Sequence, residues 1–200
     1  MKNAGLKAVI LGALINFALA VIKFYIGISS NLLTIYCDAV NNLADIFSCF
    51  IAIGGFVLIK RLNETQSKRT QSLCTFVINM FITVTGLYFV YNGLERLLYP
   101  VPVNYSVRYA ILIALTVGVK LVMALMYKAF NKSASSDVLH ALTMDSVLDC
   151  FITLTALMSL MLVSRVEFAI DGIFAIITGS IISASAVKGI IKEAKYLIKN

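Results

Sequence analysis

The chain alternates between long apolar segments and short polar ones. Each of the six apolar segments exceeds about 20 residues, enough to cross about 30 Å of hydrocarbon as a helix. They run Leu6 to Ile28, Leu32 to Ile59, Leu73 to Leu98, Tyr105 to Phe130, Val138 to Val163, and Phe168 to Ile191. Segments this long without turn residues favour helices over strands. The pattern therefore predicts an all-α membrane protein with six transmembrane helices, forming a single domain over residues 1–200 with no soluble C-terminal domain.

Composition supports this prediction. Hydrophobic residues make up 60% of the chain and charged residues only 14%, with a mean hydropathy of +0.92. A soluble domain of this length would need more charge to cover its core. Lys2 and Lys7 precede an apolar run, as in a signal peptide, but the run is long and no A-x-A site follows. We therefore interpret it as the first spanning helix.

The basic residues predict the orientation in the membrane. Twelve lie on one set of loops and ends, and only Arg96, Arg108 and Arg165 lie on the opposite set. The larger set consists of Lys2, Lys7, Lys60, Arg61, Lys68, Arg69, Lys128, Lys132, Lys188, Lys192, Lys195 and Lys199. This bias places both termini in the cytoplasm, for a multi-pass protein of the plasma (inner) membrane. The net charge of +7 then reflects topology, and the absence of a clustered basic face argues against nucleic-acid binding.

Two of the apolar segments carry polar pairs with the same spacing. Asn41 and Asp45 are four residues apart in the second segment, and Asp145 and Asp149 are four apart in the fifth. Residues i and i+4 share one face of a helix. A charge at bilayer depth costs at least about 2.5–3.5 kcal/mol on insertion scales, so such residues usually mark a substrate pathway. Two helices bearing these pairs can form a four-ligand, oxygen-rich site between them.

The donor types indicate which ligand such a site would take. Three carboxylates and an amide carbonyl are hard oxygen donors, which suit Mg, Mn, Ca and Fe(II) better than Zn or Cu. Crowded carboxylates in a low-dielectric site also have a raised affinity for protons. Protons and a divalent cation would then compete for the same oxygens. Asp38 and Cys49 lie on the same stripe as Asp45 and are expected to be supporting neighbours, although a position at the rim is open for Asp38.

A purely structural alternative exists for the acids. Lys23 and Lys120 lie inside the first and fourth segments and could pair with them. Two lysines cannot neutralise four acids, however, and pairing does not explain the twin spacing. The single histidine, His140, is about 140° around the helix from Asp145 and is expected at the membrane interface. Asp171 opens the sixth helix, where a carboxylate favours the N-terminus.

Other features predict packing. The four cysteines (Cys37, Cys49, Cys74, Cys150) are not spaced as a disulfide framework or a CxxC metal site. The sixth segment has a stripe of small residues that would let another helix approach closely. It comprises Gly172, Ala175, Gly179, Ser183 and Ala186. No Gly-rich phosphate loop, HExxH motif or nucleophile elbow is present, so we do not expect an enzyme or a bound cofactor.

These motifs resemble the membrane domain of the cation diffusion facilitator family over nearly the whole chain. The segment from Asp38 to Asp45 is similar to the family's second-helix motif, in which His or Asp stands at the position of Asn41. The Asp145–Asp149 pair falls at its fifth-helix metal pair. Supporting similarities are Asn16 to Lys23 with Gly27, Ser30 and Leu33, the stretch Tyr91 to Leu97 with Pro100, and Asp171-Gly172.

The resemblance implies a six-helix exporter that exchanges a cytosolic divalent transition metal for protons, usually as a homodimer. It also implies a manganese- or iron-type metal quartet, because Asp replaces His in the fifth helix. The chain departs from the family pattern at the inner loop, where Lys60 to Gln71 replaces a His-rich sequence, and at Leu142, where the family often has an acid. The resemblance therefore gives no support for a second metal site in that loop.

The leading hypothesis is a divalent-cation:proton antiporter with Asn41, Asp45, Asp145 and Asp149 as ligands. Mn²⁺ is favoured as the transported ion, with Fe²⁺, Zn²⁺ or Co²⁺ as other candidates. One alternative is a non-transporting membrane subunit that keeps the fold. Another is a small carrier of organic cations, for which Tyr36 and Phe47 would be the nearby aromatic residues.

Overall fold

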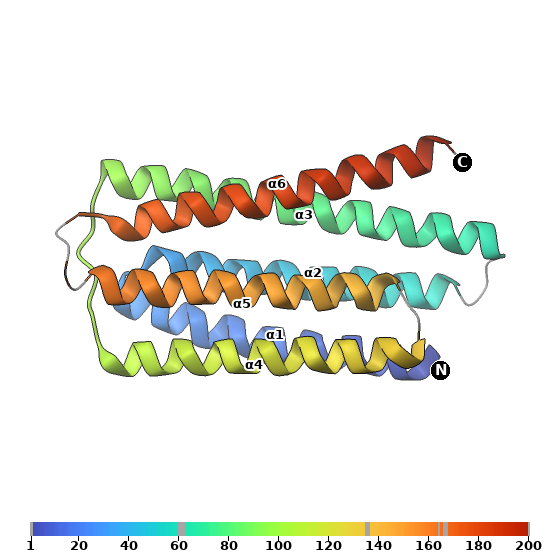
Figure 1. The fold of residues 1–200 in the computed structure, drawn as a ribbon, viewed down its shortest axis with the longest axis horizontal. Helices are drawn as coiled ribbons and strands as arrows, with labels where there is room; N and C mark the ends of the chain where they lie inside the picture. The colour runs from blue at the N-terminus through green and yellow to red at the C-terminus, as the bar shows by residue number, and fades with distance from the viewer. Residues whose placement is uncertain (1, 60–62, 135–136, 164, 166–167, 200) are drawn as a thin grey trace.

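The structure, a computed structural model, describes residues 2–59, 63–134, 137–163, 165 and 168–199. These residues form six α-helices and no strand, so the predicted all-α fold is confirmed (Figure 1). The helices are α1 (Lys2–Ser30), α2 (Leu33–Ile59), α3 (Glu64–Leu98), α4 (Val107–Ala134), α5 (Asp137–Val163) and α6 (Ile170–Lys199).

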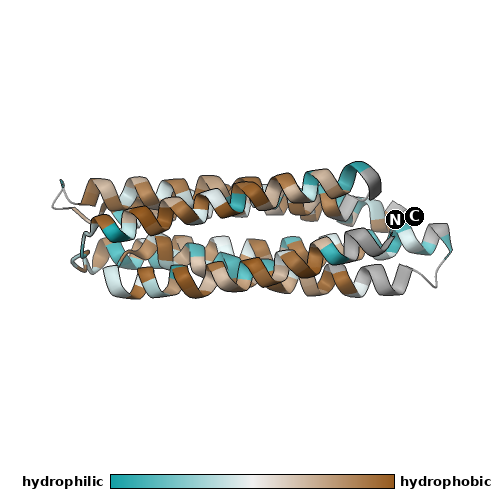
Figure 2. Ribbon diagram, turned by 90° about the horizontal axis from the view of Figure 1, so that it is seen from below, coloured by the Kyte–Doolittle hydropathy of each residue, from teal (hydrophilic) through white to brown (hydrophobic). Residues whose placement is uncertain are grey.

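Most of the helices have the length and surface of membrane spans. Within the described residues, five stretches are long and apolar enough to cross a bilayer, and none of them lies in α2: Lys7–Ser30, Gln66–Leu98, Val107–Lys132, Leu139–Val163 and Ile170–Ile198. Large apolar side chains such as Leu14, Phe17 and Val122 point outward and are at least 60% exposed. Brown, hydrophobic residues are spread along the helices in Figure 2. An apolar exterior suits contact with lipid, where only internally hydrogen-bonded elements such as helices are stable.

Two groups of helices build the bundle. α1, α2, α5 and α4 contact one another in a ring, and the α3/α6 pair packs along α2 and α5 (Figure 1). α1 begins and α6 ends at the same end of the bundle. The even number of helices explains this arrangement, which agrees with two termini on one side of the membrane.

The α3/α6 interface is built on glycine. A Cβ placed on Gly179 would lie 2.5 Å from the carbonyl oxygen of Gly86, and one on Gly172 would lie 2.9 Å from that of Gly93. The two backbones therefore touch where these glycines meet. The small-residue stripe predicted for the sixth helix does form a close helix–helix contact, as expected from packing in lipid.

The end of the bundle opposite the termini is fastened by polar contacts. Arg96 donates to the carbonyl oxygen of Asn31 at 2.9 Å and pairs with Asp171 at 3.5 Å. Asn31 has a φ of 56°, a left-handed conformation that asparagine tolerates better than most residues. Asp171 accepts a hydrogen bond from the backbone N–H of Leu33, the first residue of α2. This carboxylate therefore stabilises the start of α2 as well as lying in the first turn of its own helix.

Several helices, including α3, α4 and α6, extend beyond the apolar segments that predict them. α3 begins at Glu64, inside the predicted inner loop, with the Asn63 N–H donating to the Gln66 side chain. α4 continues to Ala134 and α6 to Lys199. Hydropathy marks only the part of a helix that lies in lipid, whereas backbone hydrogen bonding can continue into water. Lys60 and Arg61, which the basic-residue count assigns to the inner loop, lie outside the described residues.

Candidate metal site

Three carboxylates converge inside the four-helix ring. Asp45 comes from α2, and Asp145 and Asp149 come from α5. One oxygen of each lies within 4.8 Å of the others. Asp45 and Asp149 are 3% and 1% exposed, while Asp145 is half-buried. The i, i+4 spacing predicted this convergence, because α2 and α5 are neighbours and both pairs face the bundle interior.

A lysine from α4 reaches the same cluster. The Lys120 Nζ lies 2.8 Å from Asp45 Oδ2, contacts Asp149 Oδ2 and donates to Asn16 Oδ1 at 2.8 Å. The Lys120 side chain is fully buried. The structural alternative raised from the sequence is therefore correct in part, since Lys120 does pair with two of the acids. Among the described residues, no ion pair joins Asp145 to a lysine.

Asn41 contacts the cluster through its amide nitrogen. Its Nδ2 donates to Asp149 Oδ1 at 2.6 Å. An amide nitrogen with its hydrogens is a donor and cannot ligate a metal, whereas the carbonyl oxygen of the same side chain can. The predicted position of Asn41 beside the three acids thus agrees with the structure. In this conformation Asn41 holds Asp149 in place.

Asp38 forms a separate polar group one turn away. Its carboxylate pairs with Lys23 at 2.8 Å and accepts a hydrogen bond from Thr153 at 2.7 Å. Lys23 also donates to the Thr153 hydroxyl at 2.9 Å, and this hydroxyl lies 2.9 Å from the backbone carbonyl of Asp149. Asp38 is fully buried beside the cluster, and its role as a supporting neighbour stays a prediction.

Cys49 is buried on the opposite side of Asp45, as its position on the stripe predicts. It packs with Tyr127 and Leu142 in an apolar cluster. The Tyr127 hydroxyl lies directly over Gly12, where a Cβ would be only 1.6 Å away. All four cysteines are free thiols.

The remaining candidates lie away from the carboxylates. His140 is exposed on α5, in keeping with an interfacial position. Phe47 stacks on Phe81 at a centroid distance of 6.1 Å and is 56% exposed. Tyr36 packs edge-on against Phe24. Neither aromatic residue named for an organic-cation carrier therefore stacks within the cluster.

The buried acids and their partners form a polar layer across the ring: Asp38, Asp45, Asp145, Asp149, Lys23, Lys120 and Asn41. Three further residues of this layer were not predicted from the sequence. Thr153 stands four residues after Asp149 and could have been found by extending the i, i+4 series. Asn16 lies seven residues before Lys23 on the same face of the helix, a spacing that could have marked it. Asn42 is fully buried, and among the described residues neither polar atom of its amide has a hydrogen-bond partner.

Apolar clusters lie on both sides of the polar layer. One contains Val9, Met123, Tyr127 and Leu139 toward the end with the termini. The other contains Ile26, Ile113 and Leu160 toward the opposite end. The carboxylates are thus enclosed between two apolar clusters.

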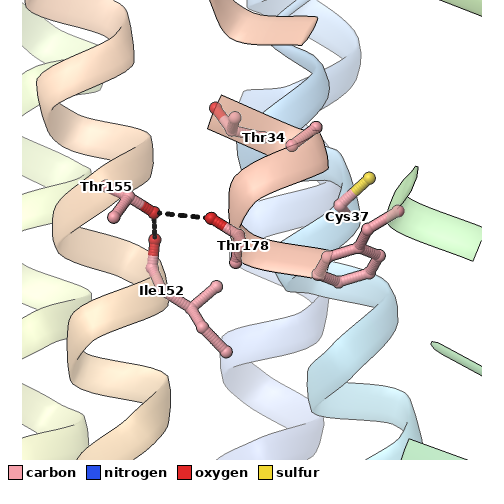
Figure 3. Close-up of a pocket in the computed structure, with 7 residues that line it drawn as sticks. Thr34, Cys37, Ile152, Thr155 and Thr178 are labelled. Carbon is pink, nitrogen blue, oxygen red and sulfur yellow. Dashed lines mark hydrogen bonds between the residues drawn. The ribbon is translucent and has the colours of Figure 1, made fainter. Parts of the chain in front are cut away.

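A narrow gap separates the ring from α6. It is lined in part by Thr34, Cys37 and Ile152, and the hydroxyls of Thr155 and Thr178 lie 3.2 Å apart across it (Figure 3). It is too narrow to hold a water molecule. None of the residues that line this gap is a carboxylate. The three converging carboxylates therefore remain the candidate metal site.

The fold is a helical bundle with long apolar helices, and three carboxylates that could hold a cation converge inside it. The sequence matches the family model for the cation efflux transmembrane domain over residues 9–198. The chain therefore belongs to the cation efflux family, the transmembrane domain of the cation diffusion facilitators, and its general function is the efflux of metal cations. No curated protein matches the chain.

Proposed function

We propose that this chain exports a divalent transition-metal cation from the cytoplasm in exchange for protons. The ligands would be the carboxylates of Asp45, Asp145 and Asp149 with the carbonyl oxygen of Asn41. Both termini would lie in the cytoplasm, and the membrane would be the plasma (inner) membrane. A homodimer stays a prediction from the family resemblance.

The convergence of three carboxylates at the centre of the ring carries this proposal. Asp45, Asp145 and Asp149 each offer an oxygen within 4.8 Å of the others, a geometry that one ion of ordinary size can bridge. With Asp38 added, four acids share the polar layer with two ammonium groups. If all are ionised, the layer has two surplus negative charges, which a divalent ion would neutralise. An uncompensated charge of this size would be costly at bilayer depth.

The enclosing apolar clusters support a carrier rather than a channel. Apolar clusters above and below the carboxylates separate them from both ends of the bundle. An ion could reach the site only when one cluster opens, and could leave when the other opens. Enclosure on both sides is the arrangement that alternating access requires.

The donor set favours Mn²⁺ as the transported ion. All four proposed ligand atoms are oxygens, and oxygen-rich sites suit Mn²⁺ better than Zn²⁺. Asn41 would have to turn its carbonyl oxygen toward the ion, since its nitrogen now contacts Asp149. Fe²⁺, Zn²⁺ and Co²⁺ remain candidates to be compared with Mn²⁺.

Protons are proposed as the exchanged ions because nothing else in the layer can balance the surplus charge. The single histidine is exposed and away from the site, so the carboxylates themselves would carry the protons. Protons stabilise the metal-free site and metal stabilises the deprotonated one. Binding should therefore release protons, and apparent metal affinity should fall at least about tenfold from pH 7 to pH 5.

The test is metal uptake into proteoliposomes across Mn²⁺, Fe²⁺, Co²⁺, Zn²⁺ and Mg²⁺, with a pH-sensitive dye inside. We expect Mn²⁺ uptake with opposite proton movement in the wild-type protein. Asp149→Asn should lose both signals. Ser159→Ala is the matched control, since this buried α5 hydroxyl makes no hydrogen bond. Uptake without proton movement would remove the antiport, and no uptake of any ion would favour the non-transporting subunit.

A further inference from the structure

The Lys120 ammonium lies where a metal ion would bind. It contacts one oxygen of Asp45 and one of Asp149, two of the three carboxylates that converge in the ring. Its third contact is Asn16 Oδ1 at 2.8 Å. The three donors of the ammonium group match these three acceptors. The side chain is fully buried.

A metal ion and this ammonium cannot both hold these carboxylate oxygens at contact distance. Both are cations, and repulsion between them is strong in a site that excludes water. A lysine has a flexible four-carbon stem, so its head group can move while its backbone stays in α4. Asn16 comes from α1, across the ring from α5, and is the one neutral partner of the three. It remains available when the two carboxylates turn to a metal.

We propose that Lys120 is a tethered competitor of the transported ion. The ammonium occupies the metal-free site, leaves Asp45 and Asp149 when metal binds, and stays hydrogen-bonded to Asn16. On release, the same ammonium returns to the carboxylates and displaces the metal. This inference rests on the proposed function, because it assumes that a divalent cation binds at these acids. It makes Lys120 a positioning residue that sets affinity and release rate without touching the ion.

The first test is Lys120→Met, which keeps the stem and removes the charge. Mn²⁺ binding, measured by calorimetry on the purified full chain, should tighten at least about tenfold because the competitor is gone. Transport of Mn²⁺ in proteoliposomes should show a lower KM and also a lower kcat, since release becomes slow. A lysine that only supported the fold would instead give weaker Mn²⁺ binding. In that case kcat would fall only as far as the fraction of folded protein falls. Weaker or unchanged Mn²⁺ binding in a folded variant overturns the proposal.

The second test leaves all charges in place, so its first measurement does not depend on Lys120→Met folding. Asn16→Leu removes the partner on which the displaced ammonium would rest. In the metal-free protein the ammonium keeps two carboxylates, but in the metal-bound protein it keeps none. Mn²⁺ affinity should therefore fall at least about threefold, and this effect should vanish in the Asn16→Leu/Lys120→Met double variant. If Lys120 does not move, Asn16→Leu leaves Mn²⁺ affinity unchanged, which overturns the proposal.

Failure of this inference can be told apart from failure of the proposed function. If wild-type protein neither binds nor transports a divalent ion, the proposed function is wrong and the competitor has nothing to compete with. If wild-type protein binds Mn²⁺ but neither variant changes its affinity in the stated direction, only the role of Lys120 is wrong. Ser159→Ala serves again as the control and should bind Mn²⁺ like the wild-type protein.

Discussion

The four-helix ring and the α3/α6 pair solve the problem of packing in lipid in opposite ways. In the ring, buried charges such as Lys23, Asp38 and Lys120 connect the helices through ion pairs and hydrogen bonds. Between α3 and α6, glycines such as Gly86 and Gly179 let the backbones touch. Both arrangements hold helices together without a hydrophobic driving force between them. Only the first gathers the carboxylates to which the proposed function assigns a cation.

This contrast separates the chemistry of the molecule from its support. The ring carries costly groups that are fully buried and therefore demand partners. The α3/α6 pair carries small residues, which cost little free energy to bury, along most of its length. A polar contact between Ser72 and Glu193 lies toward one end. A substitution in the ring should therefore change function first, and one in the pair should change stability first.

The largest expected effect comes from removing one acid of the ring. Asp45→Asn or Asp149→Asn should each lower metal transport by at least about 100-fold, because even a group that only orients a metal ligand costs about 10–100-fold when removed. Asparagine keeps a hydrogen-bond acceptor for Lys120, whereas alanine would leave that buried ammonium with fewer partners. Uptake assays on folded protein check this. Transport retained in either variant would contradict the assignment of these acids as ligands.

The next effect is on stability and concerns the pair. Gly179→Ala places a methyl group 2.5 Å from a backbone oxygen of α3 and should cost about 3 kcal/mol or more, the upper range for overpacking. Gly118→Ala on α4 is the control, because a Cβ there meets nothing within 4 Å. Thermal unfolding in detergent would measure both. Equal melting temperatures for the two variants would show that α3 and α6 do not touch as described.

The next prediction concerns ion selectivity, which should depend on whether the ligands are oxygens or imidazoles. The double variant Asn41→His/Asp145→His should shift preference from Mn²⁺ toward Zn²⁺ by at least about tenfold, since imidazole suits zinc better than an amide oxygen. Competition between the two ions in proteoliposomes measures the ratio. His140→Gln, on the exposed face of α5, should leave the ratio unchanged. An unaltered ion order in the double variant would mean that the proposed ligands do not set selectivity.

The sequence predicted the acids of the ring better than their partners. Spacing put Asp145 and Asp149 on one face of their helix and Asn41 and Asp45 on one face of theirs, because a helix fixes which residues share a face. The matching pairs then indicated a shared site. Pairing with Lys120 and Lys23 could not be derived from spacing, since it depends on which helices are neighbours and how each is rotated. Hydropathy does not supply these two facts for helices that are apolar on every side.

The ends of the helices were likewise predicted only in part from the sequence. The third helix ends at Leu98 in both the sequence prediction and the structure, because Pro100 and Pro102 follow and interrupt the helix pattern. The start of α3 at Glu64 was missed because its first turns are polar and their hydrogen bonds, such as that from Thr70 to the Gln66 carbonyl, leave no mark on hydropathy. Lipid contact determines the apolar pattern, whereas helix length also depends on local capping.

The smallest expected effect lies where the ring meets the pair. Thr155 of α5 and Thr178 of α6 join hydroxyls at 3.2 Å (Figure 3). Thr155→Val keeps the shape of the side chain and removes this bond, which should cost about 0.6 kcal/mol, the average for such bonds between membrane helices. Metal affinity should not change, because this hydroxyl bonds to Thr178 and to its own helix rather than to a carboxylate. Unfolding and calorimetry on one preparation test both statements. A change in metal affinity as large as that of Asn16→Leu would mean that the contact between α5 and α6 belongs to the site, and the separation of chemistry from support would fail.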